Sequence, residues 1–261
     1  MPAPVLLFLP AHDEAEAVGD VVARVPAEVC GHPVRCLVID DGSSDGTGSV
    51  AAAAGAEVLR FDQNRGLGAG VRAGLAAGHA MGAAAVAFCD ADGEYAPEEL
   101  ERLVAPILSG EADYVVGSRF AEGRPRHMRL HRMVGNRTLT LWVRRLTRLP
   151  VTDGQSGYRA FSPAATAAAE VIHDFNYAQV LTLDLVAKGF RYAEVPISYR
   201  FRSTGTSFVK LGPYLRKVVP AVRRELRSTS TVTAHGPMLD LRDPEVGLDD
   251  LAAPALPTAV D

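Results

Sequence analysis

Two aspartates separated by a single residue, Asp90 and Asp92, are the strongest candidates for chemistry in this sequence. They follow an apolar run at 84–89, so they would lie where a strand ends. Two carboxylates placed this way can share Mg²⁺ or Mn²⁺, which prefers oxygen ligands, and Glu94 would add a third oxygen. Such an ion stabilises the negative charge that builds on a departing diphosphate. The other interpretation is a solvated acidic loop that caps the following helix.

A second acidic cluster, at 40–47, joins two aspartates to a Gly-Ser-Ser-Asp-Gly-Thr run. Glycines permit a tight turn close to a ligand, and Asp45 or Thr47 can cap the helix that follows. A carboxylate at Asp40 or Asp41 can accept a hydrogen bond from a nucleobase N–H. The cluster therefore suits a nucleotide site, with an ordinary strand-to-helix turn as the alternative.

A glycine-rich string from Gly68 to Ala73 matches the G-x-G-x-x-A pattern of dinucleotide-binding proteins. In those proteins the glycines lie in the turn directly between a strand and a helix. Here the preceding apolar run ends near Phe61, and four polar residues at 62–65 intervene. The spacing therefore argues against a nicotinamide enzyme.

These residues must be positioned by an alternation of short apolar runs and helical patterns. The apolar runs predict strands at 4–9, 34–40, 57–61, 84–89 and 113–117. The helical patterns lie at about 15–26, 46–55, 66–82 and 97–108. The alternation predicts an α/β fold with a mostly parallel central sheet flanked by helices. Ligands bind beyond the carboxyl ends of such strands, so we expect the polar clusters to gather along one edge of the sheet.

The second half of the chain changes character and becomes rich in arginine. A helix is predicted at about 128–149, two more at 163–170 and 178–188, and a strand at 191–199. A basic helical segment follows at 209–227, and the acidic residues 228–261 are predicted to be a disordered tail. We expect one domain over 1–227, made of two halves at 1–120 and 121–227.

Composition restricts the class of protein and its compartment. A net charge of −4 over 261 residues argues against a nucleic-acid binder. Three cysteines do not suit a disulfide framework, which favours a cytoplasmic protein. No apolar run reaches the roughly 18 residues of a membrane span. The basic helices at 128–149 and 209–227 would allow peripheral contact with the anionic inner face of the plasma membrane, or else pack against the core.

Six strings, taken together, resemble family 2 glycosyltransferases with the GT-A fold. They occur in the family's order within residues 4–210: PAHDE, VIDDGSSDGT, NRGLGAGVRAG, FCDADGEY, VGSRF and TDGQSGYRAFS. The third string and a later RSTGTS are most similar to the dolichyl-phosphate mannose synthase and polyprenyl-phosphate glycosyltransferase branch. Three features depart from the family pattern: a histidine where a stacking tyrosine is usual, Ser-Phe-Val-Lys where Ser-Lys is frequent, and no transmembrane helices.

The resemblance implies that 1–120 is the nucleotide-sugar half and 121–227 the acceptor half. It also implies the site residues and a divalent metal, Mg²⁺ or Mn²⁺. The nucleotide-sugar site would comprise Pro10, Ala11, Glu14, Asp41, Gly66, Asp90, Ala91 and Asp92. The metal ligands would be Asp90, Asp92 and Glu94. The acceptor site would comprise Arg119, Arg132, Ser156, Arg159, Arg202 and Ser207. The catalytic residues would be Asp92, Asp153, Arg119, Arg132 and Arg202.

The resemblance also implies an inverting hexosyl transfer from a nucleoside-diphosphate sugar, of the GDP-mannose or UDP-glucose type, to a polyprenyl phosphate. A lipid monophosphate, with a second pKa of about 6, is already mostly ionised near neutrality and needs no general base. An alcohol acceptor would need one, for which Asp153 is the candidate. The family also allows homo-oligomers.

Three other functions remain open from the sequence alone. The same donor chemistry can serve a soluble acceptor in cell-wall or natural-product biosynthesis, which the lack of membrane helices favours. A sugar nucleotidyltransferase would share the fold but carries a glycine-rich, arginine-containing loop after the first strand, where this chain has His12-Asp13-Glu14. A non-catalytic sugar-nucleotide sensor would bind the donor without turnover.

Overall fold

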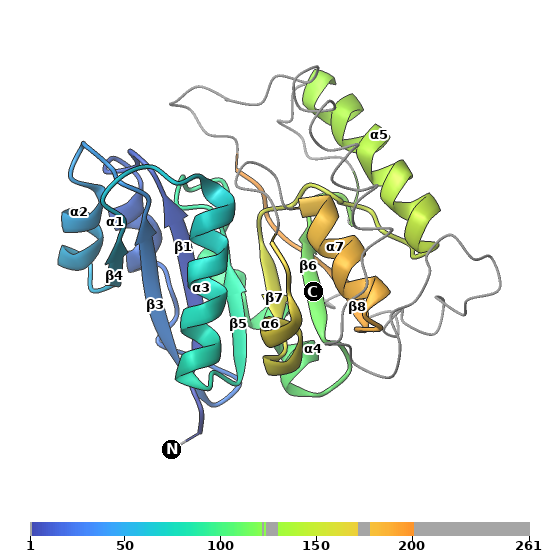
Figure 1. The fold of residues 1–261 in the computed structure, drawn as a ribbon, viewed down its shortest axis with the longest axis horizontal. Helices are drawn as coiled ribbons and strands as arrows, with labels where there is room; N and C mark the ends of the chain where they lie inside the picture. Colours follow the sequence, from blue (N-terminus) through green and yellow to red (C-terminus); the bar gives the residue numbers. More distant parts are fainter. Residues whose placement is uncertain (1, 122, 124–129, 172–177, 201–261) are drawn as a thin grey trace.

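A computed structural model describes residues 2–121, 123, 130–171 and 178–200 (Figure 1). In this part of the chain one eight-stranded sheet has the order β2-β3-β1-β5-β7-β6-β8, with β4 paired to β3. The strands are β1 (Val5–Ala11), β2 (Glu28–Val29), β3 (His32–Asp40), β4 (Glu57–Arg60), β5 (Ala85–Phe88), β6 (Tyr114–Ser118), β7 (Arg159–Phe161) and β8 (Tyr192–Pro196). The segment at 209–227, the tail at 228–261, Arg202 and Ser207 lie outside the described residues.

Helices cover both faces of the sheet and give three layers (Figure 1). The described helices are α1 (Val18–Ala23), α2 (Thr47–Ala53), α3 (Leu67–Met81), α4 (Leu100–Leu108), α5 (Leu130–Thr147), α6 (Pro163–Ala168) and α7 (Ala178–Ala187). One apolar cluster joins the sheet to α3, α5, α6 and α7, and the other joins it to α1, α2 and α4. Side chains of β1 alternate between them, with Phe8 in the first cluster and Leu7 in the second, as the pleat of a strand requires.

The predicted strands are present, and the structure adds two short strands that were not predicted, β2, which lies antiparallel to β3, and β7. Pairing is parallel for β1–β3, β1–β5, β3–β4 and β6–β8. The short strand β7 was not predicted, and it lies antiparallel between β5 and β6. Three residues are too few to show a periodicity, and β7 is stabilised by neighbours on both sides. Because it returns from the carboxyl ends of β5 and β6, the loop before it lies at the same edge as the polar clusters.

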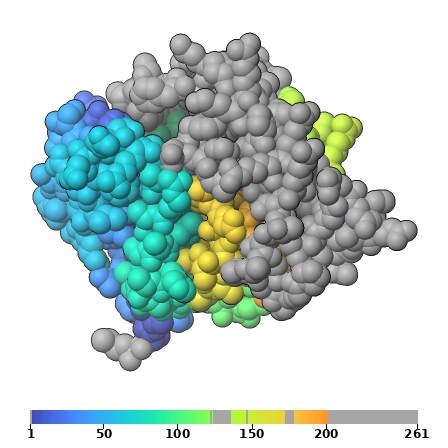
Figure 2. Space-filling view, viewed as in Figure 1, coloured from blue at the N-terminus to red at the C-terminus, as the bar shows by residue number. Residues whose placement is uncertain are grey.

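The glycines of α3 serve close packing of the helix on the sheet. A Cβ atom built at Gly74 would lie 2.3 Å from the ring of Phe8, and one at Gly78 would lie 2.4 Å from Val86. Only residues without a side chain fit there. Figure 2 shows α3 beside α6, with both covering this face of the molecule. Gly74 and Gly78 thus have a packing role, and α3 begins beside the polar edge of the sheet.

No helix among the described residues is long and apolar enough to cross a membrane.

Candidate active site

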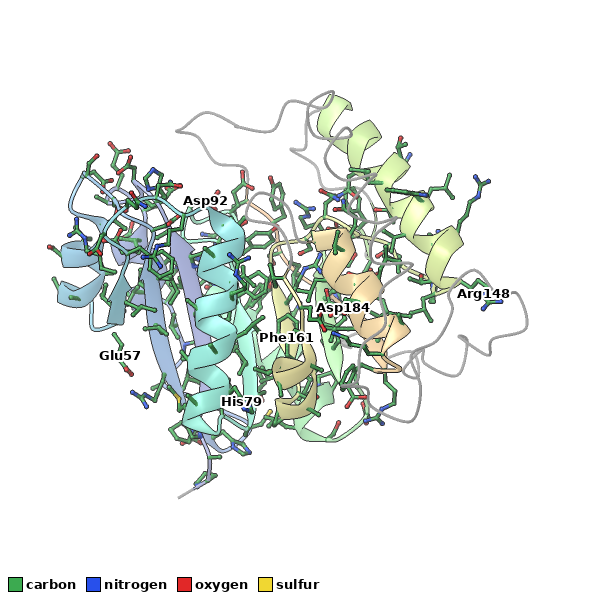
Figure 3. All side chains as sticks on the ribbon, in the orientation of Figure 1. Glu57, His79, Asp92, Arg148, Phe161 and Asp184 are labelled. Carbon is green, nitrogen blue, oxygen red and sulfur yellow. The ribbon has the colours of Figure 1, made fainter. Side chains whose placement is uncertain are left out.

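The polar clusters meet at one edge of the sheet, as the sequence predicts. Ala11 at the end of β1 pairs with Asp40 at the end of β3, and Ser118 at the end of β6 pairs with Pro196 at the end of β8. Figure 3 places Asp92, which follows β5, at this end of the molecule, and His79 in the last turn of α3 at the other end. The carboxyl ends of the strands therefore assemble the candidate site.

The loops after β1 and β3 hold each other through side chains. Glu14 donates its backbone N–H to Thr47 Oγ1 at 2.9 Å, and Asp13 donates its N–H to Ser43 Oγ at 3.1 Å. Pro10 and Ala11 are buried at the end of β1. The residues predicted to line the nucleotide site from β1 thus stand in a fixed loop next to the second acidic cluster.

Asp41 positions the beginning of α3. Its carboxylate accepts the backbone N–H of Arg65 at 2.6 Å and that of Gly66, the residue before the helix, at 2.8 Å. Gly66 has a φ of 87°, which glycine adopts without strain. The structure therefore gives Asp41 a definite structural task, and its contact with a nucleobase stays a prediction.

Asp90 lies in a crowded acidic environment. Burial, followed by the negative charges of Asp92 and Glu94, raises the pKa of Asp90 to about 8, and the nearby charge of Arg119 opposes this rise. A Cβ atom at Gly157 would lie 2.6 Å from Asp90 Oδ2, so the loop before β7 passes directly against this carboxylate. Ala91 is buried beside it. Carboxylates that raise one another's pKa are stabilised in their ionised form by a cation.

The predicted set of three metal ligands is not assembled. Within the described ranges, no group of three or more His, Cys, Asp or Glu side chains could hold a metal ion. Glu94 instead accepts a hydrogen bond from Tyr199 Oη at 2.9 Å. The pair Asp90 and Asp92 still fits a divalent cation, because it offers only oxygen atoms in an electrostatically unfavourable cluster. Diphosphate and water oxygens would complete the coordination.

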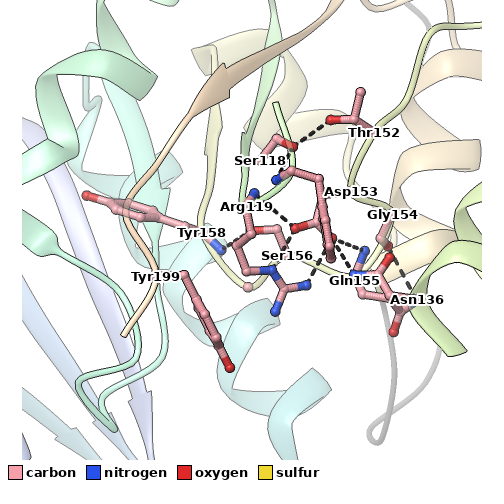
Figure 4. A network of polar contacts seen from close by, with 12 residues as sticks. Ser118, Arg119, Asn136, Thr152, Asp153, Gly154, Gln155, Ser156, Tyr158 and Tyr199 are labelled. Carbon is pink, nitrogen blue, oxygen red and sulfur yellow. Dashed lines mark hydrogen bonds and ion pairs between the residues drawn. The ribbon is translucent and has the colours of Figure 1, made fainter. Parts of the chain in front are cut away.

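A buried ion pair forms the second half of the site (Figure 4). Arg119, directly after β6, contacts Asp153 through Nε at 2.6 Å and Nη2 at 2.9 Å. Asp153 also accepts a hydrogen bond from Asn136 Nδ2 of α5 at 2.9 Å. The Arg119 guanidinium lies over the ring of Tyr199, 5.4 Å from its centroid. A positively charged group is thereby fixed beside the carboxylates that follow β5.

The same contacts decide the protonation of Asp153. Burial alone would raise the pKa of its carboxyl, but the charge and hydrogen bonds of Arg119, with the hydrogen bond from Asn136, hold the pKa below its ordinary value. Its Oδ1 also accepts the N–H of Gln155 at 3.1 Å. Asp153 is therefore a weak proton acceptor, which argues against the role of general base that the sequence suggested for an alcohol acceptor.

Two predicted acceptor residues, Arg159 and Ser156, lie inside the protein, and their role in acceptor binding stays a prediction. Arg159 is fully buried and donates hydrogen bonds to the hydroxyl of Tyr114 and to the carbonyl of Ala178. Ser156 is also buried, and its hydroxyl accepts the N–H of Tyr158. Both come from a string shared with the family, but the chain turns these side chains into the core. Arg132 lies on α5, but its side chain is not among those that the structure describes.

Sequence reasoning missed several residues that shape the site. Tyr95 accepts the N–H of Gly157 at 2.8 Å, and Glu194 of β8 accepts the N–H of Thr152 at 2.9 Å. Tyr199 contacts both Glu94 and Arg119. Tyr95 directly follows the acidic residues at 90–94, and this position is the one feature of the local sequence that could have pointed to it. The partners of Glu194 and Tyr199 are distant in the chain, so spacing gives no indication of them.

Comparison with known proteins identifies the family of this fold and site. The model of "Glycosyl transferase family 2" matches residues 7–164. Polyprenol monophosphomannose synthase of Mycolicibacterium smegmatis is 33% identical over 219 residues, which are 77% of this chain and 79% of that protein. Undecaprenyl-phosphate mannosyltransferase of Micrococcus luteus is 30% identical over 84% of this chain and 93% of that protein.

A solved structure gives the same architecture. Glucosyl-3-phosphoglycerate synthase of Mycobacterium tuberculosis, in complex with Mn²⁺, UDP and glucosyl-3-phosphoglycerate, superposes with a TM-score of 0.67. The match covers 92% of this chain and 91% of that chain at 19% identity. At this identity the likeness shows the fold alone, and the α/β sheet described above is the GT-A fold.

Proposed function

Since this chain belongs to glycosyl transferase family 2, we propose that it transfers a sugar from a nucleoside-diphosphate sugar to a polyprenyl phosphate, with inversion at the anomeric carbon. Relatives at 33% and 30% identity are named for polyprenol and undecaprenyl phosphate mannosyl transfer. A mannose donor of the GDP-mannose type therefore comes first, and UDP-glucose is the alternative donor.

The ion pair between Arg119 and Asp153 is the observation that favours a phosphate acceptor over an alcohol acceptor. An alcohol acceptor needs a base, and the candidate base is held ionised by a guanidinium, with a lowered pKa. A phosphate acceptor is already ionised, and it needs a positive charge to hold it. Arg119 supplies that charge in a fixed position, and the planar guanidinium suits phosphate oxygens.

The donor diphosphate would lie between the carboxylates and the arginine. Asp90 and Asp92 would hold Mg²⁺ or Mn²⁺, which neutralises the leaving diphosphate when bound; the related synthase structure contains Mn²⁺ and UDP. Pro10, Ala11 and Glu14 line the nucleotide side from the end of β1. The residues of this chain would then orient the donor diphosphate and the acceptor phosphate, so that the attacking oxygen of the acceptor faces the sugar.

The exposed face of α5 supports action at a membrane surface. Arg137, Arg144 and Arg145 are exposed on it, and Leu141 is 49% exposed. Basic and apolar side chains on one helix face suit an anionic lipid surface such as the inner face of the plasma membrane. The lipid acceptor would be reached from that surface.

A transfer assay tests the proposal. The full chain, with Mn²⁺ or Mg²⁺, is incubated with radiolabelled GDP-mannose or UDP-glucose and a short polyprenyl phosphate. We expect a labelled lipid product that disappears with Asp92→Ala and persists with Asp20→Ala, which removes an exposed carboxylate of α1. Donor hydrolysis without lipid product would contradict the lipid acceptor and favour a soluble one. Pyrophosphate release from a nucleoside triphosphate and a sugar phosphate would show a nucleotidyltransferase instead.

A further inference from the structure

The loop that carries Asp153 has no regular structure, yet side chains hold its backbone. Backbone N–H groups that are buried or held in place need hydrogen-bond acceptors. Because the loop that leads into β7 is not part of the sheet, the strands do not supply these acceptors. Over residues 152–158 the acceptors that the structure describes are side chains: Glu194 for Thr152 and Asp153, Thr140 for Gly154, Asp153 for Gln155, Tyr95 for Gly157 and Ser156 for Tyr158. The position of Asp153 therefore depends on side chains from other elements.

Glu194 provides the contacts nearest to Asp153. Its two carboxylate oxygens both lie 2.9 Å from the N–H of Thr152, and Oε1 accepts the N–H of Asp153 at 3.2 Å. The Thr152 hydroxyl also donates to Oε2. A further hydrogen bond, 2.6 Å long, comes from Tyr192 Oη, on the same strand. Every one of these partners is a donor, which an ionised carboxylate matches and an amide does not.

The ion pair transmits this constraint to Arg119. Asp153 contacts two nitrogens of the guanidinium, at 2.6 and 2.9 Å, and one oxygen also accepts the Arg119 backbone N–H at 3.2 Å. A shift of the 152–153 backbone would therefore move the guanidinium with it. The Arg119 side chain is only 9% exposed, so few alternative positions are open to it.

We infer that Glu194 is a positioning residue for phosphate recognition: it fixes the 152–153 backbone, and through Asp153 it fixes the direction in which Arg119 presents its charge. This inference rests on the proposed function, in which Arg119 holds the acceptor phosphate. In this role Glu194 acts through Asp153 and Arg119 and not by contact with substrate. It lies on β8, which pairs with β6, whereas Asp90 and Asp92 follow β5 on the other side of β7.

The test compares Glu194→Gln with Tyr192→Phe. Glu194→Gln places an amide NH₂ among donors and leaves the size of the side chain unchanged. Tyr192→Phe removes the one hydrogen bond of Glu194, among the described residues, that does not come from the 152–153 segment. Tyr192 is 3% exposed, so its variant controls for a general loss of stability in the core of β8.

The first measurement needs no substrate. The Arg119 Nε–H resonance in a ¹⁵N correlation spectrum of the full chain is assigned by its disappearance in Arg119→Lys. We expect Glu194→Gln to shift this resonance and Tyr192→Phe to leave it in place. An unmoved resonance in Glu194→Gln would overturn the inference, because the guanidinium would then be held without Glu194.

The second measurement is the Michaelis constant for each substrate in the transfer assay. We expect Glu194→Gln to raise KM for a short polyprenyl phosphate about five-fold or more, with KM for the nucleotide sugar within about two-fold of the unmodified chain. A shifted resonance with an unchanged acceptor KM would overturn the role in phosphate recognition. If the unmodified chain transfers no sugar to lipid, the proposed function fails, and the resonance alone decides whether Glu194 positions Arg119.

Discussion

The hydroxyl of Tyr199 donates a hydrogen bond of 2.9 Å to the carboxylate of Glu94, and so connects the segment after β8 to the acidic loop after β5. The contact is reinforced by the backbone N–H of Arg200, which donates to the Glu94 carbonyl at 2.9 Å. Glu94 is thus held toward Tyr199 and does not join Asp90 and Asp92 in a three-carboxylate group.

Removing this hydroxyl should strengthen cation binding. In Tyr199→Phe the carboxylate of Glu94 loses a donor and becomes available to an ion at Asp90 and Asp92. We expect the Mn²⁺ dissociation constant, measured by electron paramagnetic resonance with UDP or GDP present, to fall about three-fold or more. The same change made in a Glu94→Gln background should have no effect; an equal gain there would show that Glu94 is not the cause.

Breaking the ion pair of Asp153 should cost stability. Asp153→Asn leaves the Arg119 guanidinium buried without its counter-charge, and removing one partner of a buried pair costs about 3–5 kcal/mol. Urea unfolding should show a loss of that order, and Arg119→Met in the same chain should restore part of it. A loss below about 1 kcal/mol would mean that the pair is solvated.

The kinetics of the same variant separate two roles of Asp153. Since the pKa of its carboxyl lies below the ordinary range, it is ionised throughout the neutral region. We expect Asp153→Asn to lower kcat/KM at every pH between 6 and 9 by a similar factor. Loss of an acidic limb from the pH profile of kcat would instead identify Asp153 as the base.

The acidic cluster should make stability depend on pH when no divalent cation is present. The folded pKa of Asp90 is raised to about 8, mainly by burial and then by Asp92, from an unfolded value of about 3.9. The folded state therefore binds the extra proton, and stability falls as the pH rises from about 4 to 8. We expect Tm in a chelating buffer to be higher at pH 6 than at pH 8, and Asp90→Asn to reduce this difference. If Asp90→Asn left the dependence of Tm on pH unchanged, other titrating groups would be its cause.

The glycines of α3 allow a matched test of packing. Gly74→Ala would place a Cβ atom 2.3 Å from the Phe8 ring, whereas Gly70→Ala would place one 3.4 Å from Pro10. We expect Gly74→Ala to lower the free energy of unfolding by about 1–3 kcal/mol. Gly70→Ala should be neutral or stabilising by up to about 1 kcal/mol, because alanine favours the helix. Equal losses at the two positions would contradict the close approach of α3 to β1.

The exposed arginines of α5 should govern binding to anionic vesicles. Each basic residue near such a surface contributes about 1 kcal/mol, so Arg144→Glu together with Arg145→Glu should weaken binding about thirty-fold or more. Cosedimentation with vesicles of phosphatidylserine and phosphatidylcholine measures this, and vesicles of phosphatidylcholine alone serve as the control. Binding that does not depend on the anionic lipid would contradict the proposed membrane surface.

The sequence predicts the fold of residues 1–120 well, because most of its strands are short apolar runs that alternate with helical patterns. Parallel pairing and the polar edge follow from that alternation, and Asp41 and Asp90 lie where it predicts. Prediction fails at β7, a strand of three residues that depends on pairing with β5 and β6. The burial of Arg159 escapes the sequence for the same reason, since the direction of its side chain is fixed by a strand that the sequence does not reveal.

Contacts between distant residues account for the rest of what the sequence does not show. Arg119 and Asp153 are separated by 34 residues, and Glu94 and Tyr199 by 105. Each residue of these pairs has a polar side chain that would also suit a solvated loop. Only the pairing of β6 with β8, and the antiparallel return of β7, bring the partners together. Residue type and spacing therefore predict the acidic cluster after β5 but not the network behind the arginine.

The central place of β7 also sets the order in which a growing chain can complete its sheet. Until Arg159–Phe161 has left the ribosome, β5 and β6 each present an open edge, and open edges invite pairing with other chains. The half that contains β1 to β5 can form from local contacts well before this. Nascent chains that end before β7 should thus engage chaperones more strongly than chains that extend past β8, which pairs with the other edge of β6.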